Sequence, residues 1–244
     1  MRKILLTLLL LAAPVAALAA DGVPLMKAHV DVTDIPSLQR GAKLFVNYCA
    51  GCHSAKYMRF NRIAADLQLP EDLVEQYLIF TGAKIGDTMT TVMSPQDAER
   101  WFGVAPPDLS LTARRRGADW VYTYLNSFYR DDSRPVGVNN LIFPDVGMPH
   151  VLWELQGMPM PVYGENSGPE GGLRVVGVRV PENGGRLSER EYREATRDLT
   201  NFLVYMSEPI KAYRQSLGVK VLVFLLVLLV LTVLLKREYW KDVH

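Results

Sequence analysis

The sequence Cys49-Ala50-Gly51-Cys52-His53 holds both cysteines of this 244-residue chain, three positions apart, with a histidine directly after the second. This spacing is the attachment signature of a c-type haem. Each thiol can add to one vinyl group of the macrocycle, and the adjacent imidazole then lies beneath the iron as the proximal ligand. The sequence therefore predicts one haem c, bound covalently by Cys49 and Cys52, with His53 as an iron ligand.

Other sites also use a Cys-x-x-Cys pair. A zinc site needs about four ligands, but the remaining histidines, His29, His150 and His244, are scattered along the chain. A structural disulfide across so short a loop would stabilise the fold little. A thioredoxin-like motif follows a strand, whereas residues 37–48 place apolar side chains at helical spacing. A thiol–disulfide oxidoreductase therefore stays only as an alternative.

The first twenty residues have the pattern of a signal peptide. A basic start, Arg2 and Lys3, precedes an apolar run over residues 4–13, and Ala17-Leu18-Ala19 is a small-residue cleavage site. The apolar run is too short to span a bilayer comfortably. An uncleaved N-terminal anchor is the alternative. Export agrees with the haem motif, because haem is attached to such motifs on the far side of an energy-transducing membrane.

The opposite end of the chain carries a membrane segment. Residues 217–235 are apolar except for Gly218, Lys220 and Thr232, which is about the length that crosses the hydrocarbon core. A basic flank with two aromatic residues, at 236–241, predicts a cytoplasmic C-terminus. We expect an inner-membrane protein with a single span and a periplasmic haem domain. The predicted parts are a signal peptide at 1–20, the haem domain at 21–212, the anchor at 213–236 and the tail at 237–244.

The region between these ends is long enough for one domain with its own core. Its formal net charge of +1, counted over the whole chain, gives no reason to expect nucleic acid. Periodicity predicts a mainly α fold with long irregular loops, rich in Gly and Pro between residues 131 and 185. The expected elements are helices at 57–69, 72–81, 95–102, 118–129 and 187–207, and a short hairpin within 173–180.

An electron carrier needs protein ligands on both faces of its iron, and methionine raises the potential relative to histidine. Met148 and Met158 each lie between Gly and Pro on the loop-rich segment, where the following proline restricts the backbone. His150 competes as a ligand, but a surface or hydrogen-bonding role is the simpler interpretation. The run Arg114-Arg115-Arg116 is either a solvated face or a source of one arginine for a haem propionate.

Taken in order, these segments resemble the cytochrome c1 family, the haem subunits of ubiquinol–cytochrome c reductase (cytochrome bc1) complexes. The resemblance covers nearly the whole chain after the signal. It rests on Arg40-Gly41 ahead of the haem motif, and on Ala105-Pro106-Pro107-Asp108-Leu109-Ser110 with Arg114 and Arg116. It also rests on Glu208-Pro209, followed by Leu217-Gly218-Val219-Lys220 and the anchor. The family implies a class I-type c-type cytochrome domain with one C-terminal transmembrane helix.

The resemblance also implies roles for single residues. Pro107 would pack on the haem and Arg116 would face a propionate. The segment Phe-Pro-x-x-Gly-Met-Pro-His around Met148 resembles bacterial members and makes Met148 the favoured sixth ligand. The segment around Met158 is similar to the mitochondrial ligand segment and keeps Met158 as the alternative. The acidic stretch of mitochondrial relatives, which would steer a basic cytochrome c, is not evident here.

The resemblance implies an electron relay. The haem would receive an electron from a Rieske iron–sulfur protein and pass it to a soluble periplasmic cytochrome c. Cytochrome b and membrane lipid would surround the anchor, and the complex would be dimeric. Catalysis would belong to the quinol–cytochrome c oxidoreductase as a whole, with none by this subunit alone. The first alternative is a membrane-anchored cytochrome c that serves another oxidase or reductase.

Overall fold

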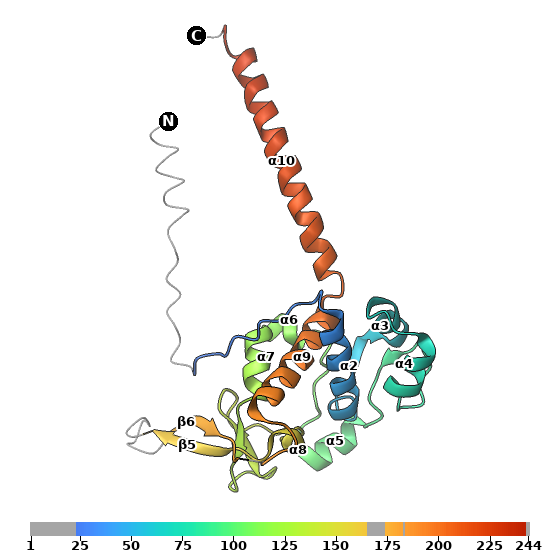
Figure 1. Ribbon diagram of the computed structural model, residues 1–244, viewed down its shortest axis with the longest axis vertical. Coiled ribbons are helices and arrows are strands. Elements are labelled where there is room, and N and C mark those ends of the chain that lie inside the picture. Colours follow the sequence, from blue (N-terminus) through green and yellow to red (C-terminus); the bar gives the residue numbers. More distant parts are fainter. Residues whose placement is uncertain (1–22, 165–173, 183, 243–244) are drawn as a thin grey trace.

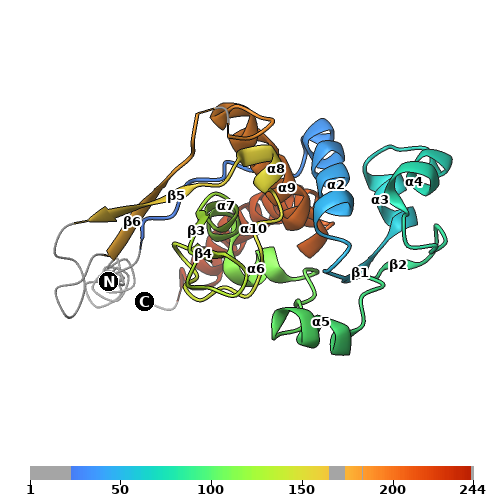
Figure 2. The same ribbon diagram turned by 90° about the horizontal axis from the view of Figure 1, so that it is seen from below.

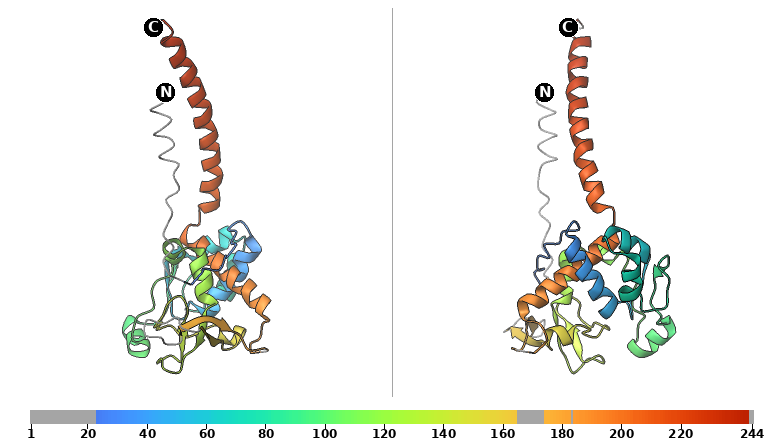
Figure 3. Two further views of the ribbon diagram at one scale, coloured as in Figure 1. Left: turned by 90° about the vertical axis from the view of Figure 1, so that its left-hand side faces the viewer. Right: turned by 45° about the vertical axis from the view of Figure 1, so that its right-hand side comes forward.

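One long helix, α10 (Lys211–Tyr239), projects from a mainly helical domain in the computed structural model (Figure 1). The structure describes residues 23–164, 174–182 and 184–242, so the expected signal peptide lies outside the described residues. Figure 3 shows the domain gathered at one end of α10. Its elements are α2 (Ile35–Tyr48), β1 (Ala55–Arg59), α3 (Phe60–Asp66), α4 (Glu71–Leu78), β2 (Thr88–Met89), α5 (Pro95–Phe102), α6 (Thr112–Arg116), α7 (Ala118–Leu125), β3 (Phe128–Arg130), β4 (Val138–Asn140), α8 (Trp153–Gln156), β5 (Met160–Gly164), β6 (Arg174–Arg179) and α9 (Glu189–Ser207).

The core is built on the crossing of α2 and α9. Both helices begin with a side-chain cap: Asp34 accepts a hydrogen bond from the Ser37 N–H, and Ser188 forms a capping box with Glu191. At the crossing, a Cβ added to Gly41 would meet the carbonyl oxygen of Asp198. Only glycine permits so close an approach of two backbones.

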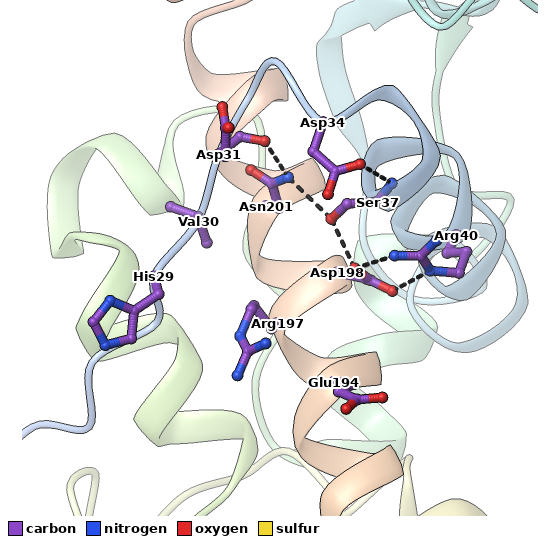
Figure 4. A pocket seen from close by; sticks show the side chains of 10 residues that line it. All are labelled: His29, Val30, Asp31, Asp34, Ser37, Arg40, Glu194, Arg197, Asp198 and Asn201. Atoms are coloured by element: carbon purple, nitrogen blue, oxygen red, sulfur yellow. Dashed lines mark hydrogen bonds and ion pairs between the residues drawn. The ribbon is translucent and has the colours of Figure 1, made fainter.

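Aromatic packing and a polar cluster complete this crossing. The rings of Phe45 and Phe202 lie 5.7 Å apart between centroids, and both residues are fully buried. The Asp198 carboxylate accepts hydrogen bonds from the Ser37 hydroxyl (2.7 Å) and from Arg40 Nε (2.5 Å). A polar pocket of about 310 Å³ opens beside this cluster (Figure 4).

Several predicted helices are shorter than expected because short strands replace their ends. The helix expected at 57–69 begins only at Phe60, after β1, which pairs antiparallel with β2. The helix expected at 118–129 ends at Leu125, where the Asn126 side chain donates to the Tyr122 carbonyl (2.7 Å). Phe128 then enters β3, which pairs with β4.

The predicted hairpin within 173–180 was wrong in its pairing. Residues 174–179 form only one strand, β6, and its antiparallel partner is β5 at 160–164. The residues that connect the two strands, 165–173, lie outside the described part of the chain. The partner strand is interrupted by Pro161, so its sequence shows no alternating pattern that would have indicated a strand.

The helix α10 is long and apolar enough to cross a membrane. Its most apolar stretch has a mean hydropathy of 3.0, and none of its residues is buried by the rest of the protein. At its start, Glu208 accepts a hydrogen bond from Arg214 Nε (2.5 Å) and lies 3.3 Å from Arg114 Nη1. These two ion pairs join α10 to the helical domain.

Candidate haem site

The haem motif forms a tight turn at the end of α2. The Cys49 N–H donates to the Phe45 carbonyl (2.8 Å), and the N–H groups of Cys52 and His53 both donate to the Cys49 carbonyl (3.0 and 2.8 Å). Neither cysteine is in a disulfide bond. Cys49 is 8% exposed, and burial raises the pKa of its thiol to about 12.

This environment separates the alternatives for the cysteine pair. A redox-active or nucleophilic cysteine needs a lowered pKa and access to solvent, whereas Cys49 is buried with a raised pKa. Within the described residues, no cluster of three or more His, Cys, Asp or Glu side chains is suitable for a metal ion. Covalent haem attachment through thioether bonds requires neither a reactive thiolate, unlike a redox pair, nor additional Cys or His ligands, unlike a zinc site. The pair therefore fits covalent haem attachment.

The Pro-Pro-Asp-Leu-Ser segment at 106–110 runs alongside the motif. The Leu109 N–H donates to the Ser54 carbonyl (2.8 Å), which joins the two segments directly. The Asp108 carboxylate accepts from the Lys56 N–H (3.0 Å), and the Ser110 hydroxyl accepts from the Tyr57 N–H (3.1 Å). The segment therefore fixes the residues that follow the haem motif in space.

The same segment orients His53. Its Nδ1 lies 2.7 Å from the Pro107 carbonyl oxygen, which can only accept, so Nδ1 carries the proton and donates. The other ring nitrogen, Nε2, then has a free lone pair, as an iron ligand requires. Burial lowers the pKa of His53, which also favours the neutral imidazole. A histidine held in this tautomer, beside two cysteines that are not in a disulfide, fits a haem c.

One small apolar cluster brings both candidate methionines together. Phe128, Val138 and Val146 form its buried centre, and Met148 and Met158 both pack against it. Packing alone therefore does not distinguish the two as sixth ligand.

Tyr124 does distinguish the two methionines, because its hydroxyl lies 3.4 Å from Met148 Sδ, within hydrogen-bond distance of a sulfur. Its ring stacks on Trp120, at 5.2 Å between centroids, and meets the edges of Phe128 and Phe143. Burial raises the pKa of Tyr124, so the hydroxyl stays protonated and remains a donor.

His150 is buried, so the surface part of its simpler interpretation from the sequence is wrong. The side chain is 4% exposed, and its ring stacks on Phe128 at 5.1 Å with an interplanar angle of 10°. Its Nε2 has no hydrogen-bond partner within the described part of the chain. Burial lowers the pKa of His150 to about 4. The residue serves as a neutral packing group beside the methionine cluster.

The three arginines at 114–116 do not share one role. Arg114 pairs with Glu208 near the start of α10. Arg116 instead lies over the Trp120 ring, with Cζ 4.7 Å from its centroid, and 5.9 Å from that of Phe143. In the described part of the chain no carboxylate forms an ion pair with Arg116. Its charge is therefore unneutralised, as a propionate-binding residue requires.

Some residues that build this site were not identified from the sequence. Thr91 donates from its hydroxyl to the Gly51 carbonyl (2.8 Å), and its N–H donates to the Ser54 hydroxyl (3.0 Å). No local pattern marks Thr91, because its partners lie about forty positions away along the chain. Tyr124 lies within the helix expected at 118–129, but its contact with Met148 depends on tertiary packing.

We expect Tyr124→Phe to lower the reduction potential of the haem by tens of millivolts if Met148 is a ligand. A hydrogen bond contributes about 0.5–1.5 kcal/mol, and only part of it differs between redox states. Removing the donor leaves the sulfur a better electron donor, which stabilises the oxidised form. Potentiometric titration of the purified protein measures the shift. Tyr122→Phe, which removes a hydroxyl that donates to the Arg193 carbonyl, is the control. Equal shifts in both variants would contradict the assignment.

Comparison with known proteins identifies a family model and two relatives that match most or all of this chain. A family model described as the Cytochrome C1 family matches residues 26–156 and 187–243. Cytochrome c1 of Allochromatium vinosum is 54% identical over the full length of both chains. A protein of Nitrosomonas europaea named "Ammonia monooxygenase gamma subunit" is 49% identical over 100% of this chain and 99% of its own length.

More distant relatives have the same family name. Cytochrome c1 of Rhodospirillum rubrum is 26% identical over 86% of this chain and 83% of its own. Among solved structures, a chain of a hyperthermophilic respiratory complex III aligns with a TM-score of 0.41 at 15% identity, and covers 85% of this chain and 77% of that one.

Proposed function

Since this chain belongs to the cytochrome c1 family, we propose that it relays single electrons from a Rieske iron–sulfur protein to a soluble cytochrome c. Members of the family carry a covalently bound haem c. When bound, this group supplies reversible one-electron oxidation and reduction at its iron. The observation that supports the role most directly is the His53 tautomer fixed by the Pro107 carbonyl.

We assign the binding of the haem to residues of three segments. Cys49 and Cys52 form the thioether bonds, and His53 is one axial ligand. Met148 is the second axial ligand, an assignment supported by its contact with Tyr124 and by its place within the matched residues. Met158 lies outside the matched residues, which is why we favour Met148.

The remaining residues of the site orient the His53 ligand and contact the haem. The Pro107 carbonyl fixes the orientation of the His53 ring, and the exposed Pro107 side chain is proposed to pack on the haem. Arg116, held over Trp120, neutralises a propionate by charge-assisted hydrogen bonds. None of these groups is assigned a proton transfer, so quinol oxidation belongs to the complex and not to this chain alone.

We propose that α10 anchors the chain in the inner membrane beside cytochrome b. The basic residues in its last turn, Lys236 and Arg237, support a cytoplasmic C-terminus and a periplasmic haem domain. The proposed division of the chain is a signal peptide at 1–20, a haem domain at 21–212, an anchor at 213–236 and a tail at 237–244. We propose that the complex is dimeric, and the only support for this is membership of the cytochrome c1 family.

Affinity purification of the full-length chain from mildly solubilised membranes tests the partners. We expect cytochrome b and a Rieske protein to co-purify in equal amounts with this chain. The name of the Nitrosomonas europaea relative supports a second candidate, a c-type subunit of a membrane monooxygenase. Recovery of monooxygenase subunits in place of cytochrome b and the Rieske protein would contradict our proposal and support that candidate.

A further inference from the structure

The hairpin of β5 and β6 is an addition to a scaffold that is already closed without it. Residues 157–186 fall in the gap between the two stretches that the family model matches. Directly outside this gap, the Leu187 N–H donates to the Leu155 carbonyl (3.0 Å). Just inside it, the Arg186 N–H donates to the Glu154 carbonyl (3.0 Å). The two ends of the segment therefore meet in space, and the haem domain is continuous across its base.

The neck of the hairpin is built for this close approach. A Cβ added to Gly157, which has a φ of +85°, would lie 2.6 Å from the carbonyl carbon of Gly184. One added to Gly185 would meet the backbone of Gln156 and Gly157. Backbones packed this tightly hold the hairpin in one position relative to the domain.

The strands of the hairpin expose apolar side chains to solvent. Met160, Val162, Tyr163 and Val176 are 41–55% exposed. Val176 is the extra residue of a bulge, since Val162 pairs with Gly177 and Tyr163 with Val175. Bulges redirect side chains and are frequent beside functional sites. The register places Met160 and Val162 on the face that also carries Arg174 and Arg179, and Tyr163 on the opposite face. A two-stranded hairpin is marginally stable alone, and exposed apolar side chains that share a face indicate an interaction surface.

The charges of the two strands are all positive. Arg174 and Arg179 are exposed, and neither forms an ion pair with a carboxylate in the described residues. The sequences of β5 and β6 contain no Asp or Glu. An apolar surface bordered by two arginines that form no ion pair among the described residues is complementary to a partner that presents carboxylates around an apolar centre.

The position of the hairpin restricts the kind of partner. Figures 1 and 3 show the hairpin at the end of the domain opposite to α10, so neither the bilayer nor a membrane-embedded subunit reaches it. Its base joins the site, because the Arg130 N–H of β3 donates to the Pro159 carbonyl (2.8 Å). The preceding residue, Met158, packs in the same cluster as Met148.

We propose that Met160, Val162, Arg174, Val176 and Arg179, here called the hairpin surface, dock the acidic face of the soluble cytochrome that accepts the electron. The proposal rests on the proposed function, since an acceptor exists only if the haem relays electrons. This charge arrangement, a basic surface that binds an acidic cytochrome, is the reverse of an acidic docking site that binds a basic cytochrome c. The arginines steer the encounter and the apolar centre excludes water from the contact.

The test compares three forms of the full complex. One carries Arg174→Glu and Arg179→Glu. In a second, Asn-Gly replaces residues 161–178 and joins Met160 to Arg179, which are paired in the hairpin, while Met158 and the neck are kept. The control carries Lys43→Glu and Lys84→Glu, an equal charge change at exposed lysines that are not in the described ion pairs. These lie in α2 and after α4, away from the hairpin in Figure 2.

The measurement is the second-order rate of electron transfer to two purified soluble cytochromes c, one with an acidic face and one basic. At low salt we expect both hairpin variants to react about tenfold more slowly than the control with the acidic cytochrome, because charge steering changes association rates by about 10–10³-fold. High salt should reduce the difference for the arginine variant. The rate with the basic cytochrome should not fall.

Two results separate failure of this inference from failure of the proposed function. Quinol-driven reduction of the haem is measured in the same samples without acceptor. If that reduction is normal and the acidic cytochrome reacts equally fast with all three forms, the hairpin surface is not the docking site. If quinol does not reduce the haem even in the unmodified complex, the proposed function itself is wrong.

Discussion

Gly41→Ala is expected to destabilise the haem domain by about 3 kcal/mol or more, at or above the top of the range of about 1–3 kcal/mol typical of overpacked cores. The new methyl group would meet the Asp198 carbonyl oxygen and lie 2.7 Å from Cβ of Phe202. Neither atom can move without shifting the backbone of α9, so α2 and α9 would separate. Domains of this size are stable by only about 5–15 kcal/mol, so the fraction of chain that retains haem should fall. Urea unfolding followed by haem absorbance measures the loss.

The control for this prediction is Gly86→Ala. A Cβ added at Gly86 has no atom within 4 Å, and its backbone does not have a positive φ. It should change the free energy of unfolding by no more than about 0.5 kcal/mol, as ordinary surface substitutions do. A Gly41→Ala protein as stable as the Gly86→Ala protein would show that α2 and α9 do not cross as closely as described.

Met148→Leu is expected to remove one axial ligand and lower the reduction potential by on the order of 0.1–0.3 V, within the range of about 0.8 V that axial ligands span. Leucine matches methionine in volume and apolarity but has no sulfur to donate electrons to the iron. The ferric protein should also lose the weak red absorption band of methionine-ligated haem. Optical redox titration of the purified complex records both effects.

Met158→Leu is the matched variant, since Met158 packs in the same cluster as Met148. It should keep the band and the potential, because its only expected loss is a small change in packing. If Met158→Leu removes the band and Met148→Leu retains it, the ligand assignment must be reversed. The Tyr124 hydroxyl would then be a packing contact with no influence on the iron.

The features that could be predicted from the sequence are those set by residues close together in the chain, such as helix starts and the haem motif. The signals that begin α9 and α5 are local: Ser188 with Glu191, and Ser94 before Pro95. Both helices begin within two residues of the expected start. The haem motif could be recognised for the same reason, since its two cysteines and its histidine lie within five residues.

Features set by contacts between segments far apart in the chain could not be predicted from the sequence. The Pro-Pro-Asp-Leu-Ser segment was noticed as a family feature, but its work of orienting His53 through the Pro107 carbonyl is visible only in the structure. The separation of Arg114, which pairs with Glu208, from Arg116, which lies on Trp120, likewise depends on tertiary packing. The strand β5 escaped prediction because its partner, β6, follows a long connection.

The central claim is that this chain carries one haem c which quinol reduces within a complex that contains cytochrome b and a Rieske protein. A pyridine haemochrome assay of the purified complex, followed by addition of quinol, tests it most directly. We predict one c-type haem per chain, reduced by quinol in the complete complex and not in samples from which the Rieske protein has been removed. A chain without c-type haem, or with titratable free thiols at Cys49 and Cys52, would contradict the account.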